Sequence, residues 1–373
     1  MKTKVFRVIL FFLVIIIIPA FTLFGEKETV SYNENKTLAE FPELSLESWK
    51  SRSFMNGMAD FFSDHFVQRE NFIRLKNAIE KAIGKNEING VIEIDGNLIQ
   101  TFRDIDYTMT DRNLAALNKL KGKNPDIDFY FMPVITAQEK LKNSMPSYLA
   151  VDDESEYVAH CFEKLSNIEC IDVSREIIET NYSFYRTDHH WTTESAFAAY
   201  TAAGGIMGYV PLSENEFTAQ TVTTEFKGTL YSKTLNESIK LDEIKAYRTN
   251  SEFTFTVKDE VYGSLYFDEY LTEKDKYSYF LGGNHGICTV ENKNADYEKT
   301  LLVIKDSYAN CFIPFLAEHY SKITLVDPRY CSHSQLREIA PSDYSGVLVL
   351  FNVSGFSTEQ NFSLIEFMGG NQK

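Results

Sequence analysis

The sequence has no excess of basic residues. Lysine and arginine number 37 against 53 aspartates and glutamates, which gives a formal net charge of −16. A nucleic-acid partner is therefore excluded, because neutralising phosphates requires an excess of Lys and Arg on one face. Internal repeats and low-complexity tracts are also missing. With 44% apolar and 24% charged residues, the composition is that of an ordinary globular protein.

Cysteine is scarce as well. The five cysteines show neither a CxxC pair nor a Cys/His spacing that would build a zinc site. Cys161 and Cys170 could bridge outside the cell, but an odd number and sparse use do not indicate a disulfide-dependent scaffold. We assign the cysteines a structural role, and we expect no cofactor.

A long apolar run is present, at the N-terminus. Lys2, Lys4 and Arg7 precede an apolar stretch from Val8 to Phe24. No small-residue cleavage site follows, so we expect an uncleaved membrane anchor over residues 1–25, with a cleaved secretory signal as the alternative. The basic flank should stay in the cytoplasm, which places the body of the protein outside the membrane. Residues 26–45 are polar and are predicted to be a tether.

The rest of the chain, residues 46–373, is predicted to be one α/β body. Apolar periodicity predicts helices over 46–83, 111–123 and 154–167, a hairpin over 90–102, and a helix that begins at Thr192 or Thr193 and ends at Gly204-Gly205. Apolar runs predict strands at 127–135, 169–173, 301–304, 323–326 and 347–353. Such alternation favours a parallel sheet with helices on both faces. Residues of about 210–281 are predicted to be a β-rich insertion.

Two short segments carry residues suited to catalysis. In the first, Asp188 stands two residues before His190, immediately ahead of the capped helix. A carboxylate at that spacing can fix the tautomer of an imidazole that acts as a general base. A metal site is not predicted, because neighbours in an extended chain alternate faces, so His189 and His190 should not share one ion.

The second segment contains Ser307, which follows an apolar strand and begins a helix-like run. This position predicts a hydroxyl at the carboxyl edge of the sheet, beside backbone N–H groups that can stabilise an oxyanion. A lone serine there is more often a helix cap. Arg329 and Tyr330 should emerge at the same edge and contact a substrate oxygen, and Asn352 could donate an amide to the oxyanion. The plainer alternatives are a surface ion pair for Arg329 and a turn residue for Asn352.

Together these motifs resemble a known family. The segment from Thr187 to Thr192 is similar to the signature of the DHHW proteins of bacterial cell envelopes, which are related to alginate O-acetyltransferase-like proteins. Further blocks that resemble this family are Glu34–Leu38 through Pro42, Asp64-His65-Phe66 with Arg69, Gly282–His285 and Lys305–Tyr308. The resemblance implies an SGNH-hydrolase-like fold in which Asp and His precede Ser, a permuted order. It also implies that Ser307 is the nucleophile, His190 the base and Asp188 its orienting carboxylate, with Lys305 in place of the glycine of a Gly-Asp-Ser block.

The function implied by this resemblance is an extracytoplasmic O-acyltransferase that acetylates a cell-wall or capsular polysaccharide. A polytopic membrane acyltransferase is the implied partner, since acetyl donors are made in the cytoplasm. Two alternatives remain open at this stage. The same residues would serve an esterase that removes acetyl groups, and a non-catalytic envelope protein could use the fold to bind glycan or to scaffold an assembly.

Overall fold

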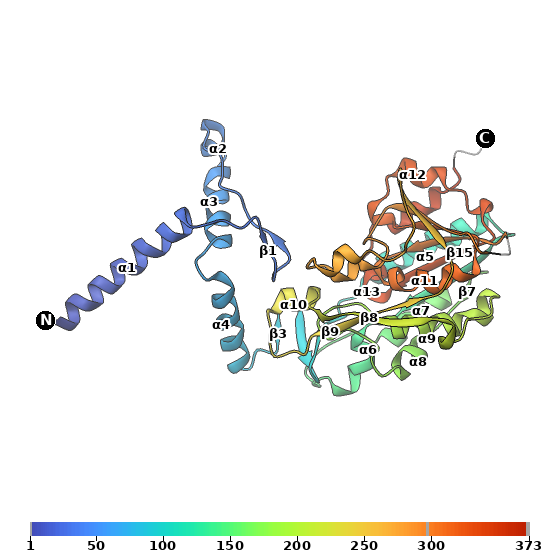
Figure 1. The fold of residues 1–373 in the computed structure, drawn as a ribbon, viewed down its shortest axis with the longest axis horizontal. Coiled ribbons are helices and arrows are strands. Elements are labelled where there is room, and N and C mark those ends of the chain that lie inside the picture. The colour runs from blue at the N-terminus through green and yellow to red at the C-terminus, as the bar shows by residue number, and fades with distance from the viewer. Residues whose placement is uncertain (1, 296–297, 371–373) are drawn as a thin grey trace. The chain divides into compact units, whose positions relative to one another are not determined.

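The computed structural model of the protein describes residues 2–295 and 298–370 (Figure 1). The chain divides into two compact units. The first comprises Met1–Asn89 with Tyr231–Ser238, and the second comprises Gly90–Leu230 with Ile239–Lys373. All the residues predicted to form a catalytic site lie in the second unit.

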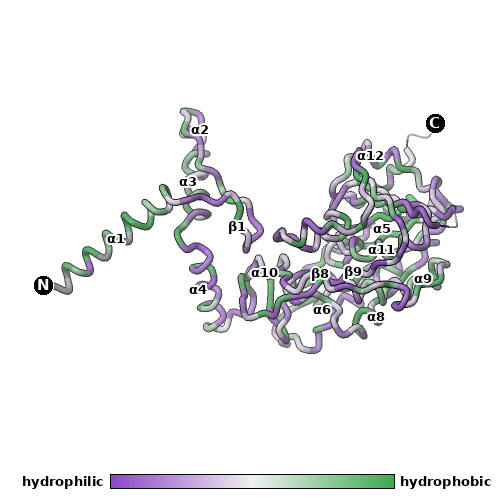
Figure 2. Tube along the Cα trace, in the orientation of Figure 1, coloured by the Kyte–Doolittle hydropathy of each residue, from purple (hydrophilic) through white to green (hydrophobic). Residues whose placement is uncertain are grey.

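The first unit begins with helix α1 (Lys2–Phe24), which is apolar along most of its length (Figure 2). Its Val5–Phe24 stretch is long and apolar enough to cross a membrane, and its mean hydropathy is 2.7. The other elements of this unit are short: β1 (Val30–Ser31), β2 (Lys36–Thr37), α2 (Leu46–Lys50), α3 (Ser53–Asp64), α4 (Arg69–Ala82) and β3 (Glu87–Ile88).

Residues 26–45, predicted to be a tether, contain the antiparallel pair β1–β2 and contact α3. The backbone N–H of Ala39 donates to Asp64 Oδ2 at 3.0 Å, and Lys36 Nζ lies 2.5 Å from Asp64 Oδ1. These contacts hold the segment against a helix of the same unit.

The second unit is built on an eight-stranded sheet in the order β11-β10-β12-β14-β13-β15-β6-β7. Its strands are β6 (Asp128–Val134), β7 (Glu169–Cys170), β10 (Phe253–Val257), β11 (Glu260–Tyr262), β12 (Ile287–Asn292), β13 (Thr300–Lys305), β14 (Lys322–Val326) and β15 (Gly346–Asn352). The predicted parallel sheet is confirmed for β14, β13, β15, β6 and β7. The antiparallel strands β12, β10 and β11 extend one edge of this sheet.

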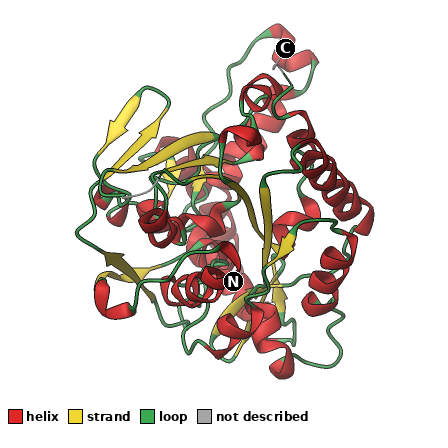
Figure 3. Cartoon of the chain, turned by 90° about the vertical axis from the view of Figure 1, so that its right-hand side faces the viewer, coloured by secondary structure: helices red, strands yellow, loops and turns green. Residues whose placement is uncertain are grey.

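Helices cover both faces of the sheet (Figure 3). The helices of this unit are α5 (Tyr107–Lys123), α6 (Ala137–Leu141), α7 (Glu154–Lys164), α8 (Ser174–Glu179), α9 (Thr193–Met207), α11 (Ile313–Leu316), α12 (His333–Glu338) and α13 (Val353–Thr358). Helix α10 (Thr229–Thr234) contains the sequence boundary between Leu230 of the second unit and Tyr231 of the first. Helix α5 contacts α7 and α13, and α9 contacts α8 and α11. The leucines that predicted α5, Leu114, Leu117 and Leu120, are fully buried, as expected for an amphipathic helix on a core.

The predicted hairpin is confirmed as β4 (Val91–Ile94) paired with β5 (Asn97–Gln100). In the β-rich region, β8 (Thr218–Phe226) and β9 (Asp242–Arg248) form a separate antiparallel pair, whereas β10 and β11 join the main sheet. All five cysteines are free thiols, so Cys161 and Cys170 do not bridge.

The predicted end of helix α9 is wrong. The helix passes through Gly204 and ends at Met207, and the residue that caps it, Gly208, has a left-handed φ of 72°. Gly204 is needed for a close approach rather than for a helix stop, because a Cβ there would lie 2.5 Å from Pro211 Cγ. Gly204 therefore permits the chain to fold back on the helix.

Candidate active site

Ser307 lies where strand β13 ends at the carboxyl edge of the sheet. Asp306 caps the short 3-10 helix η5 (Ser307–Cys311) by accepting a hydrogen bond from Tyr308 N at 2.9 Å. The backbone N–H and the side-chain amide of Asn352, at the end of the neighbouring strand β15, donate to the other Asp306 oxygen at 2.8 and 2.6 Å. Asp306 thus fixes the turn that presents Ser307.

The Asp188–His190 loop approaches this turn from the other side. Asp242, the first residue of β9, is fully buried and accepts hydrogen bonds from Arg186 N and Thr187 N, each at 2.8 Å. Beyond the loop, Thr192 caps α9 as predicted, with its side chain accepting from Ser195 N. The loop is therefore held at both ends by rigid elements.

The structure brings Asp188, His190 and Ser307 together in one chain of hydrogen bonds. His190 Nδ1 lies 2.5 Å from Asp188 Oδ1, and His190 Nε2 lies 2.8 Å from Ser307 Oγ. The three residues are 2%, 5% and 8% exposed, so bulk water is largely excluded from these bonds. This arrangement matches what general-base activation of a serine requires: a nucleophile, a base within hydrogen-bond reach, and a carboxylate that orients the base.

Asp188 is held as a carboxylate. Burial opposes its ionisation, but the neighbouring His189 and His190 and several hydrogen bonds outweigh it and hold the pKa of Asp188 well below its usual range. Thr229 donates twice to Asp188 Oδ2, from its backbone N at 2.7 Å and from its Oγ1 at 2.9 Å. Gly228 permits this approach, because a Cβ there would lie 2.2 Å from Asp188 Cβ.

The His190 ring is fixed by packing. Tyr277 stacks on it with ring centroids 3.7 Å apart and planes 10° apart. The Tyr277 hydroxyl donates to the backbone oxygen of Ser307 at 3.2 Å, and Trp191 Nε1 donates to the backbone oxygen of Tyr308 at 2.8 Å. Burial raises the pKa of Tyr277 well above its usual value, so its hydroxyl stays protonated as a donor.

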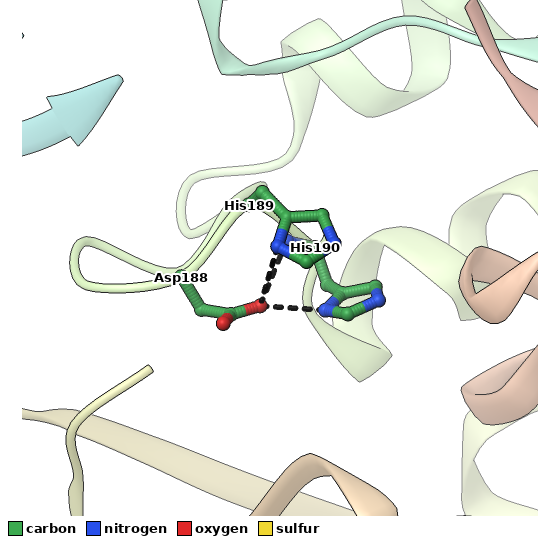
Figure 4. A group of neighbouring side chains, drawn as sticks. All are labelled: Asp188, His189 and His190. Carbon is green, nitrogen blue, oxygen red and sulfur yellow. Dashed lines mark hydrogen bonds and ion pairs between the residues drawn. The ribbon is translucent and has the colours of Figure 1, made fainter. Parts of the chain in front are cut away.

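The two histidine rings do not point to opposite faces, which corrects the sequence-based argument. Their centroids lie 3.9 Å apart, and ligand atoms of Asp188, His189 and His190 all lie within 4.8 Å of one another (Figure 4). The alternation argument fails because the backbone bends here instead of running extended. The 2.5 Å contact between Asp188 and His190 is nevertheless hydrogen-bond geometry, since two ligands of one tetrahedral zinc stand about 3.3 Å apart. His189 Nδ1 lies 2.8 Å from Thr229 Oγ1.

Arg329 and Asn352, two of the further predicted site residues, are bound to buried carboxylates. Arg329 donates to both oxygens of Asp327, at 2.8 and 2.6 Å, and Asn352 donates to Asp306 as described above. Tyr330 remains 56% exposed and lies beside a separate hollow. The structure therefore gives Arg329 and Asn352 positioning contacts, and leaves Tyr330 accessible.

Lys305, which replaces a glycine of the resembled Gly-Asp-Ser block, points away from solvent. It is 1% exposed, and its Nζ donates to Asn310 Oδ1. Burial lowers the pKa of Lys305, while the nearby Asp327 opposes that shift. Asn310 in turn donates to Gly283 O at 3.3 Å and to Asn284 Oδ1 at 3.2 Å. Lys305 thus bonds to Asn310, the residue of η5 that contacts the Gly282–His285 block.

Sequence reasoning missed three residues that shape the site: Asp242, Thr229 and Tyr277. All three come from the stretch predicted to be a β-rich insertion, and Tyr277 lies there in the 3-10 helix η4 (Lys276–Tyr279). No motif or spacing marks them, because each acts through a contact far away in the sequence. Asp242 is an acidic residue buried in a strand. Its burial would have marked it as a site residue, but burial is seen only in the structure.

An open hollow of about 410 Å³ adjoins the site. We call this hollow the triad hollow. Its lining residues are Ile99, Gln100, Thr136, Ala137, Asp188, His189, Leu230, Tyr308, Asn352 and Ser354. It therefore offers a small, partly apolar space on the β15 and β6 side of Ser307.

Comparisons with known proteins show that solved structures share this fold. A crystal structure of a DHHW family protein from Eubacterium siraeum is similar with a TM-score of 0.65 and 23% identity, covering 76% of this chain and 97% of that one. Bacillus cereus PatB1 is similar with a TM-score of 0.59 and 20% identity, covering 72% and 97% of the two chains. PatB1 with a sulfonyl adduct gives a TM-score of 0.60 at 19% identity, covering 74% and 99%. No curated protein matches the chain.

The fold is thus an SGNH-like α/β fold, in which the Asp and His segment precedes the Ser segment. The family model described as DHHW protein matches residues 163–326, which include Asp188, His190 and Ser307. This match confirms the resemblance to DHHW proteins over residues 163–326. The blocks at 34–42 and 64–69 lie outside the matched residues.

Proposed function

We propose that this protein is an extracytoplasmic serine-dependent O-acyltransferase that transfers an acetyl group to a hydroxyl of an envelope polysaccharide. The observation that carries the proposal is the buried Asp188–His190–Ser307 hydrogen-bond chain, with contacts of 2.5 and 2.8 Å. A serine that merely caps a helix has no need of an oriented imidazole, so this chain of bonds favours a nucleophile.

In the first half-reaction, Ser307 Oγ attacks the carbonyl carbon of the acyl donor while its proton passes to His190 Nε2. The tetrahedral intermediate collapses, the donor's leaving group takes the proton from His190, and an acyl-serine ester remains. Asp188 stays ionised throughout and stabilises the imidazolium that forms between the two proton transfers.

In the second half-reaction, a sugar hydroxyl gives its proton to His190 Nε2 and attacks the acyl-serine carbonyl. Collapse of this intermediate returns the proton to Ser307 Oγ and releases the acetylated sugar. If water replaces the sugar, the same steps describe an esterase. The acceptor alone distinguishes the two activities.

Full-length protein in detergent micelles would be tested with p-nitrophenyl acetate, with and without a pentasaccharide acceptor. We expect p-nitrophenol release and acetylated sugar, both lost in Ser307→Ala. Free acetate alone would indicate the esterase. Phenylmethylsulfonyl fluoride should label Ser307, because a sulfonyl group reacts with an activated serine and PatB1, which shares the fold, has been solved with a sulfonyl adduct. Wild-type rates in Ser307→Ala would refute a catalytic serine.

We also propose that α1 anchors the protein in the membrane with its body outside, beside a polytopic acyltransferase that supplies the acyl group. The apolar Val5–Phe24 stretch and the preceding basic residues support this orientation. An anchor would raise the local concentration of the body near such a partner. Protease added to intact spheroplasts should digest the body, and full protection would contradict the proposal. Retention of α1 in the isolated protein, measured by mass, would separate an anchor from a cleaved signal.

A further inference from the structure

A second hollow lies along the same edge of the sheet as Ser307. Strand β12 runs antiparallel to β14, so its first residue, Ile287, pairs with the last residue of β14, Val326. The last residue of β10, Val257, pairs with Cys288. The beginning of β12 and the ends of β10, β14 and β13 therefore share one edge.

This hollow, which we call the Tyr330 hollow, has an open volume of about 920 Å³. Its lining residues are Thr256, Val257, Lys258, Asn284, His285, Gly286, Ile287, Cys288, Thr289, Tyr330 and Gln335. Hydroxyl, amide and imidazole groups dominate, and no aspartate or glutamate is among the described residues that line it. Such a surface suits a ligand rich in hydroxyl groups.

Tyr330 is an exposed aromatic ring whose position is fixed by its neighbours. The Arg329 guanidinium lies over the ring, 5.4 Å from the centroid, and is itself held by the fully buried Asp327 through two hydrogen bonds. More than half of Tyr330 nevertheless stays exposed, at 56%. An exposed ring held in one orientation loses little side-chain entropy when a ligand stacks on it.

The loop that carries Tyr330 is also locked to the floor of the hollow. A Cβ at Gly286 would lie 2.5 Å from Tyr330 O, so only glycine permits this approach. Cys331 Sγ donates to Gly286 O at 3.0 Å. The hollow is thus a built feature of two loops and not a gap between mobile side chains.

The Tyr330 hollow is connected to the nucleophile. Asn310, on the same 3-10 helix as Ser307, donates to Asn284 Oδ1 in the lining at 3.2 Å. One strand, β14, separates β13 from β12, which amounts to about 10 Å along the sheet edge. A chain of a few sugar rings can span that distance, whereas a lone acetyl group cannot.

We propose that the Tyr330 hollow binds a neutral pyranose ring of a glycan, with Tyr330 as the stacking platform and Lys258, Asn284 and Gln335 as hydrogen-bonding groups. The triad hollow, smaller and partly apolar, then remains for the acyl donor. The role of the bound glycan as the acceptor rests on the proposed function. The binding of a glycan to the Tyr330 hollow is independent of that function. A neutral sugar is favoured because uncharged hydroxyl and amide groups outnumber the one lysine of the lining, and because the chain as a whole carries a net charge of −16, which repels polyanions.

Binding would be measured by calorimetry with full-length Ser307→Ala in detergent micelles, so that no turnover occurs. The probes are cellopentaose, chitopentaose and a galacturonate pentamer. We expect at least one neutral pentasaccharide to bind, and Tyr330→Ala in the same background to weaken it at least tenfold. Tyr330→Phe, which keeps the ring, should bind within threefold of the parent. Tyr148→Ala is the matched control, since Tyr148 is also exposed, at 67%, and lies outside the hollow.

Each outcome decides the proposal. Failure of all three probes, or unchanged affinity in Tyr330→Ala, would overturn the site. Binding of the galacturonate pentamer alone would overturn the neutral-sugar assignment. These results are distinct from failure of the proposed function, which would be read from unchanged p-nitrophenyl acetate hydrolysis in Ser307→Ala. A glycan that binds here while Ser307→Ala hydrolyses the ester normally would support the subsite and refute the catalytic serine.

Discussion

His190 Nε2 lies 2.8 Å from Ser307 Oγ, although 117 residues separate them in the sequence. The contact forms because the loop before α9 and the turn after β13 both lie at the carboxyl edge of the parallel strands, where α/β proteins place their ligands. The order of the residues along the chain is irrelevant to this geometry. The site requires that both loops be held rigidly. Substitution of the residues that hold the two loops tests this requirement.

Asp188→Asn should abolish most activity while preserving the fold. An amide in place of the carboxylate can still hydrogen-bond, but it favours the wrong imidazole tautomer and cannot stabilise the imidazolium. The kcat for p-nitrophenyl acetate should fall on the order of 10⁴-fold. Ser307→Ala is the matched control, since both variants should retain cooperative thermal unfolding. A loss of activity under tenfold in Asp188→Asn would show that His190 does not depend on this carboxylate.

Gly228→Ala should disable the site by sterics alone. The added Cβ would lie 2.2 Å from Asp188 Cβ and 2.4 Å from Asp188 Oδ2, so the carboxylate must move. Displacement of a catalytic group by about 1 Å lowers kcat roughly 100-fold, which the chromogenic assay would detect.

Gly205→Ala provides the control for that substitution. Gly205 lies in α9, and a Cβ there would meet nothing within 4 Å. Alanine in a helix interior is favoured over glycine by about 1 kcal/mol, so Gly205→Ala should keep full activity and melt slightly higher. Equal activity losses in both variants would mean that Gly228 has no special role.

Much of this site was predictable from sequence, for physical reasons. Asp188 and His190 lie two residues apart, so their contact is local, and Ser307 follows an apolar strand whose end fixes its place at the sheet edge. Asp242 was not predictable, because its hydrogen bonds to Arg186 and Thr187 join residues 56 and 55 positions apart in the sequence. Strand β10 was predicted only as part of the β-rich insertion, since periodicity identifies strands but not their neighbours. Strand β12 was not predicted as a strand.

The buried pair Lys305 and Asn310 offers a test by double-mutant cycle. Asn310→Leu removes the amide oxygen that accepts from Lys305 Nζ and leaves a cation buried with one partner fewer. Unfolding in urea should show a loss of roughly 2–3 kcal/mol. Lys305→Met with Asn310→Leu should recover part of that loss, because the unpaired charge is then gone. Additive effects of the two substitutions would show that these residues do not interact.

Glu154, in the first turn of α7, lies behind the triad hollow. Its carboxyl group is fully buried and accepts hydrogen bonds from Thr136 N at 2.6 Å and from Thr136 Oγ1 at 2.5 Å. Burial raises the pKa of Glu154 from 4.5 to about 7, against the effect of these hydrogen bonds. The folded state therefore binds a proton more tightly than the unfolded chain does.

Stability should consequently depend on pH through Glu154. A raised pKa contributes stability that is fully present below pH 4.5 and is lost as pH rises to about 7, an effect on the order of 3 kcal/mol. Glu154→Gln, which cannot ionise, should lack this loss, so between pH 4.5 and pH 8 it should gain stability relative to wild type in urea unfolding. Glu156→Gln is the matched control, because Glu156 is exposed on the same helix. A pH profile unchanged by Glu154→Gln but altered by Glu156→Gln would place the proton elsewhere.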